Sequence, residues 1–397
     1  MASTDQPSAP ARVLLLHNRY RAAGGEERVV DQQEALLRER GHAVARLERD
    51  SSQTGAAQAA RGLLRGGLGE DEVAEAVRAH RADVVHAHNV HPLFGWRALA
   101  AARAAGARVV LHLHNYRLVC ATAMAYRDGA PCTRCHGRDT RPGVRLRCRG
   151  SLPEAVVYGA GIARQQPHLL AHADACVLVS RAQAATLAQL GAELPGAVVL
   201  PNAVERIAAD SAAADGTYAL VAGRLVEEKG YEMAVRAARA AGVPLRVAGE
   251  GPAEPALRAL AGDGDVRFLG RLPGPELAVQ RRGAALMLAP SRALDPSPMS
   301  VVEALADGVP VLASDRGGLL ELVGSGAALP ADDEPAWTAA LAALWADPAL
   351  RAARGADALA RARAEHSPDV YYDRLTAVYA RVLGFGRRAG RGSERRG

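Results

Sequence analysis

Short apolar runs alternate with amphipathic segments twice along this chain, and that alternation limits the folds open to it. The first set is "RVLLLHN", "DVVHAHN", "RVVLHLHN", "ACVLVS" and "AVVLPN", with the helical segment "EERVVDQQEALLRERGH" after its first run. The second set is "YALVAGR", "PLRVAGE", "VRFLG", "ALMLAPS" and "VPVLASD", with helical segments such as "GYEMAVRAARAAG" in between. Apolar strands separated by helices are typical of parallel sheets covered on both faces. The sequence therefore predicts an α/β protein with two tandem Rossmann-like, doubly wound domains.

The length of 397 residues agrees with two domains, because it exceeds what one hydrophobic core usually serves. We expect an N-terminal domain over residues 11–203 and a C-terminal domain over residues 216–365, joined by the Ala/Asp-rich "ERIAADSAAADGT". A helix over residues 366–385 is expected to pack back toward the N-terminal domain, and residues 386–397 to form a disordered basic tail. Two such domains place a ligand cleft between the carboxyl edges of their sheets.

The net charge of +6 leaves nucleic acid, anionic lipid and phosphorylated ligands open as partners. No run approaches 18 apolar residues, and the polar start "MASTDQPSAPA" lacks the features of a secretory signal. We therefore expect a cytoplasmic protein whose cysteines are reduced unless they hold a metal.

The segment "DPSPMSVVEALADG" follows an expected strand and carries two carboxylates eight positions apart. Ser297 suits a helix N-cap, Pro298 the first helical position and Gly308 the residue past the end, which predicts a helix over Pro298–Asp307. Its start would direct free N–H groups and the positive dipole end into the cleft, where phosphate binds well. Glu303 would face the cleft and accept hydrogen bonds from sugar hydroxyls. Taken alone, this stretch is better interpreted as a surface helix with an ordinary solvated Glu303.

Two cations, Arg224 and Lys229, follow the first strand of the same domain in "AGRLVEEKG" and would neutralise a diphosphate, although a solvated basic loop reads the same way. Together with "AGEGP", "FLGRLP", "GGEE", "DVVHAHN", "HLHNYRLVC", "VLVSRA" and "LPNAV", these segments closely resemble the retaining nucleotide-sugar glycosyltransferases of family 4, which have the GT-B fold. The resemblance runs roughly from Val13 to Val323. No G-x-G-x-x-G motif stands at the first turn, which disfavours a dehydrogenase.

The family's C-terminal motif has the form E-x7-E, and Glu303 matches its second Glu, which the resemblance implies binds the donor ribose. Asp295 stands in the first place and departs from the motif, with a side chain one C–C bond shorter. His114 matches the active-site histidine, expected to bond the donor sugar. These residues, with Arg224 and Lys229, are the candidate catalytic set. The implied donor site also includes Gly24 and Gly25 of the glycine loop, Gly249, Phe268, Ser297, Met299, Ser300 and Val301.

The implied activity is transfer of a sugar from a UDP- or GDP-sugar to a hydroxyl acceptor, with retention at the anomeric carbon and no catalytic metal. The acceptor, bound by the N-terminal domain, would be a glycolipid, a polysaccharide precursor or a natural product, and no nucleic acid is implied. Two other classes stay open: a non-catalytic nucleotide-binding scaffold, which Asp295 makes conceivable, and a nucleotide-sugar epimerase or phosphorylase. Another rival is a catalytic metal, since His86 and His88, like His112 and His114, share one strand face.

An insertion over about residues 116–152 carries four cysteines spaced C-x11-C-x2-C-x12-C: Cys120, Cys132, Cys135 and Cys148. In a reducing compartment this spacing favours a structural zinc over two disulfides, with four plain thiols as the remaining alternative. Cys176 lies in an apolar strand and is expected in the core. The insertion also carries six arginines, which either bind a phosphorylated or lipid-linked acceptor at the inner face of a membrane or form a solvated face. They are Arg134, Arg138, Arg141, Arg145, Arg147 and Arg149.

Overall fold

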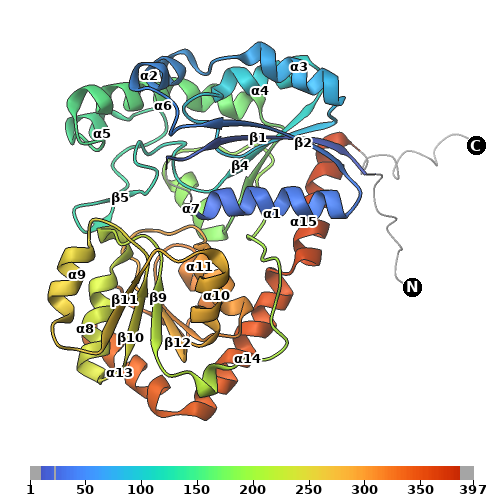
Figure 1. Cartoon of the computed structure of the whole chain (residues 1–397). Coiled ribbons are helices and arrows are strands. Elements are labelled where there is room, and N and C mark those ends of the chain that lie inside the picture. Colours follow the sequence, from blue (N-terminus) through green and yellow to red (C-terminus); the bar gives the residue numbers. More distant parts are fainter. Residues whose placement is uncertain (1–9, 22–23, 385–397) are drawn as a thin grey trace, which may run out of the picture.

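The protein contains two six-stranded parallel sheets, as the alternating sequence pattern predicted (Figure 1). The computed structural model describes residues 10–21 and 24–384. The strand orders are β2-β1-β3-β4-β7-β8 and β11-β10-β9-β12-β13-β14. In both sheets the first strand lies inside and the order reverses beside it, so each has a topological switch point, where ligands bind in this class. The predicted fold class is confirmed.

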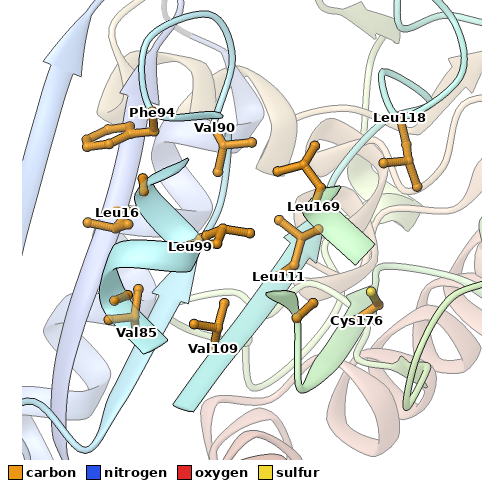
Figure 2. Close-up of a cluster of buried hydrophobic side chains, with 14 of the residues drawn as sticks. Leu16, Val85, Val90, Phe94, Leu99, Val109, Leu111, Leu118, Leu169 and Cys176 are labelled. Atoms are coloured by element: carbon orange, nitrogen blue, oxygen red, sulfur yellow. The ribbon is translucent and has the colours of Figure 1, made fainter. Parts of the chain in front are cut away.

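The N-terminal sheet is buried on both faces at its centre. Figure 2 shows Leu16, Val85 and Val109 from three neighbouring strands packed against Phe94 and Leu99. Cys176 lies in the same cluster and is fully buried, which confirms it as a core residue. The elements are β1 (Arg12–Arg19), α1 (Gly25–Glu39), β2 (Ala43–Asp50), α2 (Ala56–Arg65), α3 (Glu70–His80), β3 (Val84–Ala87), α4 (Gly95–Ala104), β4 (Arg108–Leu113), α6 (Leu152–His172), β7 (Ala175–Leu178), α7 (Arg181–Gln189) and β8 (Val198–Val199).

The C-terminal sheet has a core on each face, one beneath α8 and α13 and the other beneath α11 and α14. Its elements are η1 (Ala213–Asp215), β9 (Ala219–Ala222), η2 (Glu227–Lys229), α8 (Tyr231–Ala241), β10 (Leu245–Ala248), α9 (Glu254–Ala261), β11 (Val266–Gly270), α10 (Gly274–Arg282), β12 (Leu286–Ala289), α11 (Met299–Ala306), β13 (Val311–Ser314), α12 (Leu319–Val323), β14 (Ala328–Leu329), α13 (Glu334–Ala346) and α14 (Pro348–Glu365).

The last helix, α15 (Pro368–Leu383), returns from the C-terminal domain and packs on the N-terminal sheet (Figure 1). Tyr379 and Tyr371 are buried there beside strands β1 and β3. The two segments that connect the domains contact each other, because the Val204 N–H donates to the carbonyl oxygen of His366 at 3.0 Å. The tail predicted over residues 386–397 lies outside the described residues. Within the described ranges, no helix combines the length and apolar character needed to span a bilayer.

The insertion forms a flap, here residues 116–150, between β4 and α6. It contains the two-stranded hairpin of β5 (Tyr126–Arg127) and β6 (Ala130–Pro131) and the short helix α5 (Arg141–Arg145). Figure 1 shows the hairpin reaching from the N-terminal domain toward the C-terminal one. Contact is made there, since the Tyr126 hydroxyl donates to Glu227 Oε1 at 3.1 Å.

Candidate functional site

Two helices from opposite domains begin next to each other. A Cβ atom on Gly25, the first residue of α1, would lie 3.1 Å from Met299 Cγ, the first residue of α11. A glycine at this position therefore permits the close approach. Among the described residues, the amides of Met299 and Ser300 have no hydrogen-bond acceptor, whereas the Val301 N–H donates to the carbonyl oxygen of Pro298 at 3.0 Å. Two positive helix ends thus meet in the cleft.

The predicted cap of the second helix is wrong by one residue. Pro298, in an extended conformation, is the N-cap, so α11 runs over Met299–Ala306 and is one residue shorter at each end than expected. Ser297 makes no cap bond, because its Oγ is buried without a hydrogen-bond partner. Its carbonyl oxygen instead accepts from Asn202 Nδ2 at 3.2 Å, across the domain boundary. Gly308 follows the helix end with φ +70°, as predicted.

Lys229 and Asp295 form one ion pair. Lys229 Nζ donates to Asp295 Oδ1 at 3.0 Å and to Oδ2 at 2.8 Å. The side chains are only 18% and 10% exposed. They meet because β9 and β12 are neighbours, so the loops after their carboxyl ends adjoin. An incoming diphosphate would compete with Asp295 for the ammonium group of Lys229. The predicted roles of Lys229 and Asp295 are therefore linked.

Lys229 is the single lysine among 49 lysines and arginines in the chain. Everywhere else the sequence uses arginine for a cation. A lysine presents a compact point charge, whereas a guanidinium is planar and larger. This compositional signal, which the motif analysis overlooked, independently marks Lys229 as special.

Arg224 lies in the same loop after β9 as Lys229 and is the more exposed of the two. Its side chain is 59% exposed and lies 3.7 Å from Glu228. Burial and then the Asp295 carboxylate raise the pKa of Tyr231, and Arg224 acts in the opposite direction. Arg224 and Asp295 therefore both act electrostatically on the buried Tyr231 phenol.

Glu303 is held between guanidinium groups from both domains. Its Oε2 accepts from Arg281 Nη1 at 2.7 Å, and its Oε1 accepts from Arg28 of α1. Arg281 also donates through Nε to Asp307 at 2.6 Å. Arg28 is 46% exposed, whereas Arg281 is 10% exposed. A ribose reaching Oε1 would displace the exposed Arg28 and leave the buried Arg281 contact in place.

His114 belongs to a stack of imidazoles at the ends of β3 and β4. Its Nε2 lies 2.9 Å from His88 Nδ1, and His86 Nε2 lies 3.1 Å from His112 Nδ1. Burial lowers the pKa of His114 to about 3, and of His86 likewise to about 3. With a pKa this low, His114 is neutral at pH 7 and a weak base, whereas an effective general base has a pKa near the working pH. His88 fixes its orientation.

The alternative prediction of a catalytic metal bound by histidines has three ring nitrogens near one another in its favour. One ring nitrogen each from His86, His88 and His112 lies within 4.8 Å of the others, the only such group among the residues the structure describes. Hydrogen bonds within the stack already engage one nitrogen of every ring. The Nε2 atoms of His88 and His112 have no hydrogen-bond partner. The adjoining cavity of about 30 Å³ has room for water that would satisfy them.

Four other residues predicted in the donor site have structural contacts that do not depend on a donor. A Cβ on Gly249 would lie 1.9 Å from the carbonyl oxygen of Gly223, so strand packing alone requires glycine here. The Phe268 ring lies under the guanidinium of Arg258 at 4.4 Å. Val301 is fully buried in the core. Gly24 is the N-cap of α1, and its N–H donates to Glu27 Oε2 at 2.7 Å.

Two adjacent carboxyl groups after the glycine loop have pKa values that are shifted in opposite directions. Burial raises the pKa of Glu26 to about 7. Burial acts the same way on Glu27, but the nearby His17 ring, whose Nε2 lies 3.8 Å from Oε1, and hydrogen bonds from the amides of Tyr20 and Gly24 outweigh it and lower the pKa of Glu27 to about 2. Such divergent pairs are typical of acid and base assignments. Glu26 lines the cavity beside His114, so it is a candidate that the sequence analysis overlooked.

These shifts predict opposite pH dependences of stability. The folded protein holds a proton on Glu26 up to about pH 7, whereas the unfolded chain loses it near 4.5, so this contribution falls as pH rises between those values. We expect the free energy of unfolding of Glu26→Gln to rise relative to wild type between pH 5 and pH 8, by up to about 3 kcal/mol. Glu27→Gln is the control. It should lose stability at pH 7 and approach wild type as pH falls toward 3. If stability varied with pH in the same way in all three proteins, the opposite pKa shifts assigned to Glu26 and Glu27 would be wrong.

Comparisons with known proteins agree with this architecture. Residues 216–347 match the family described as "Glycosyl transferases group 1". The chain is 34% identical over 170 residues to a GDP-mannose-dependent monoacylated alpha-(1-6)-phosphatidylinositol monomannoside mannosyltransferase of Corynebacterium glutamicum, covering 39% of this chain and 45% of that protein. It is 30% identical over 220 residues to a phosphatidyl-myo-inositol mannosyltransferase of Mycolicibacterium smegmatis, covering 53% and 56%. The chain thus spans about half the length of these curated relatives.

Solved structures match nearly the whole chain. Sucrose-phosphate synthase from Thermosynechococcus elongatus superposes with a TM-score of 0.67 at 19% identity, covering 94% of this chain and 100% of that one. Anabaena HepE in complex with UDP superposes with a TM-score of 0.63 at 16% identity, covering 93% and 100%. At such identities the likeness establishes the fold. The GT-B architecture expected from the sequence is confirmed.

Proposed function

We propose that this GT-B chain, whose C-terminal domain matches the group 1 glycosyl transferases, is a retaining glycosyltransferase that uses a nucleoside-diphosphate sugar. The observation that carries the proposal is the meeting of two helix starts and the Lys229–Asp295 pair between the sheets. Free amides, helix dipoles and one buried ammonium group together suit a diphosphate. Arg224 lies close enough to add a second cation.

In this proposal the diphosphate is both leaving group and base. As the bond to the sugar breaks, negative charge grows on the phosphate oxygens, and Lys229, Arg224 and the α11 amides stabilise it. The leaving phosphate then takes the proton of the acceptor hydroxyl on the same face, so configuration is retained. Neutral His114 positions the donor sugar, and Glu303 binds the ribose. No step needs a pair of nucleophilic carboxylates.

The relatives favour a mannosyl donor and a lipid acceptor. Both reported relatives are named as mannosyltransferases acting on phosphatidylinositol derivatives, and one as dependent on GDP-mannose. We propose GDP-mannose as the first donor to test, with UDP-sugars next, because HepE binds UDP. A membrane-bound glycolipid is the proposed acceptor class. The exposed arginines of the flap would meet its anionic headgroups.

A thermal melt with separate nucleotides tests the donor class. At about 100 times Kd a ligand adds about 2.7 kcal/mol to the free energy of unfolding, and each kcal/mol moves Tm by roughly 2 to 4 °C at this size. We expect GDP to raise Tm by more than about 5 °C, with smaller effects of UDP, ADP and dTDP. No shift with any nucleotide would contradict the donor site.

Product analysis separates the enzyme classes. With GDP-mannose and an acceptor lipid, a glycosyltransferase forms a new glycoside with the α configuration retained. An epimerase would isomerise the nucleotide sugar without an acceptor, and a phosphorylase would need inorganic phosphate. Nucleotide binding without turnover of any donor would favour the non-catalytic scaffold.

A further inference from the structure

The flap is anchored in the N-terminal core by Tyr116, Leu118, Val119 and Ala125, but its residues 126–150 contain no buried apolar side chain. Its regular structure amounts to two strands of two residues and one helix of five. Four of the chain's five described non-glycine residues with positive φ lie in it: Ala123, Ala125, Asp128 and Arg147. Segments of this size and irregularity are commonly held together by a disulfide or a metal. None of the four flap cysteines is in a disulfide.

The fold brings these four thiols into one neighbourhood. A Cβ on Gly143 of α5 would lie 3.4 Å from Cys135 Sγ and 4.0 Å from Cys148 Sγ, so both sulfurs flank this residue. Cys120 and Cys135 both pack against the same N-terminal core cluster, and Cys132 lies three residues before Cys135.

Polar groups already lie beside two of the sulfur atoms. Arg127 Nη1 lies 3.6 Å from Cys148 Sγ. The Thr122 hydroxyl lies 3.2 Å from Cys120 Sγ. A neutral thiol is a weak acceptor, whereas a metal-bound thiolate is oriented and stabilised by such surrounding hydrogen bonds.

We propose that Cys120, Cys132, Cys135 and Cys148 bind one structural Zn²⁺ that fixes the flap against the C-terminal domain. The four thiols lose their protons on binding, and the cation neutralises the repulsion among the thiolates. Within the described residues, no three of these sulfur atoms lie within 4.8 Å of one another. Zn–S bonds of about 2.3 Å require a spacing of about 3.8 Å, so binding must draw the side chains inward.

The proposed zinc would act on the cleft from outside it. Tyr116 at the start of the flap donates through its hydroxyl to the carbonyl oxygen of Leu294 at 2.8 Å. Tyr126 in the hairpin contacts Glu227. These contacts adjoin the loops that carry Asp295 and Lys229. Zinc binding itself does not depend on the proposed transferase activity, and neither does its test.

The experiment is a metal analysis of the full chain, purified under reducing conditions with a tag that contains no histidine. Elemental analysis should give about one zinc per chain for wild type. The zinc content of Cys132→Ser/Cys135→Ser should fall at least about tenfold, whereas Cys176→Ala, on β7 in the core, should keep its zinc. Cys148→Ser should lose zinc, whereas Cys148→His should retain it, since three thiolates and one imidazole form a common zinc site.

Cobalt substitution gives a second readout that does not require the serine variants to be stable. Wild type loaded with Co²⁺ should show the sulfur-to-cobalt charge-transfer absorption of a thiolate site. Three results would overturn the proposal: wild type without zinc and with all flap thiols reactive, a disulfide between flap cysteines, or full zinc retention in Cys132→Ser/Cys135→Ser. The last would place the metal elsewhere, for example at His86, His88 and His112.

Discussion

Lys229→Ala is expected to lower the turnover number by roughly 10² to 10³-fold, the typical cost of removing one donor from a site of developing negative charge. Lys229→Arg should lose nearly as much, because the side chain is only 18% exposed and is bonded to both oxygens of Asp295. A planar guanidinium does not fit where a compact ammonium does. The measurement is kcat with the donor that the thermal melts identify.

The matched control is Arg224→Lys, because that side chain is 59% exposed and has room to vary. It should keep most of the activity. Lys229→Ala/Asp295→Asn removes the unpaired carboxylate that the single variant leaves buried, so it separates loss of stability from loss of chemistry. Lys229→Ala turning over within a few-fold of wild type, with an unchanged Tm, would refute the role.

The sheets could be predicted because their strands are buried on both faces. β2 escaped prediction for the opposite reason. As an edge strand beside β1 it is mostly half-buried, so its sequence "AVARLERD" mixes charges with small apolar residues. Pairing with β1 over eight residues, rather than burial, holds it in place. The flap hairpin could not be predicted either, because strands of two residues are too short to show a periodic sequence pattern.

Within the site, the motifs identified residues but not their partners. Asp295 and Lys229 stand 66 positions apart, and only the adjacency of β9 and β12 joins them. Arg28 and Glu303 come from different domains, so no local pattern links them. The prediction of Ser297 as the N-cap failed because the cap position depends on the local backbone conformation. In the structure Pro298, one residue later, is the N-cap.

Arg281 and Arg282 show most sharply what sequence leaves out. They are adjacent in "QRRG", and nothing in that segment tells one from the other. In the structure Arg281 is buried between Glu303 and Asp307, while Arg282 is 42% exposed and 4.0 Å from Asp307. Their substitutions should therefore differ greatly.

We expect Arg281→Met to lower the free energy of unfolding by about 3 to 5 kcal/mol. Glu303 and Asp307 are 11% and 12% exposed, so losing the shared guanidinium leaves buried carboxylates without their main partner, and that loss outweighs the retained apolar stem. Because each kcal/mol moves Tm by roughly 2 to 4 °C, the melting point should fall by on the order of 10 °C. A thermal melt measures this directly.

Arg282→Ala is the neighbouring control and should cost no more than about 1 kcal/mol, as surface pairs do. Arg281→Met/Asp307→Asn should recover part of the lost Tm, because one of the two stranded charges is removed. Equal melting points for Arg281→Met and Arg282→Ala would mean that the buried triad does not support α11, and that Glu303 is oriented by other contacts.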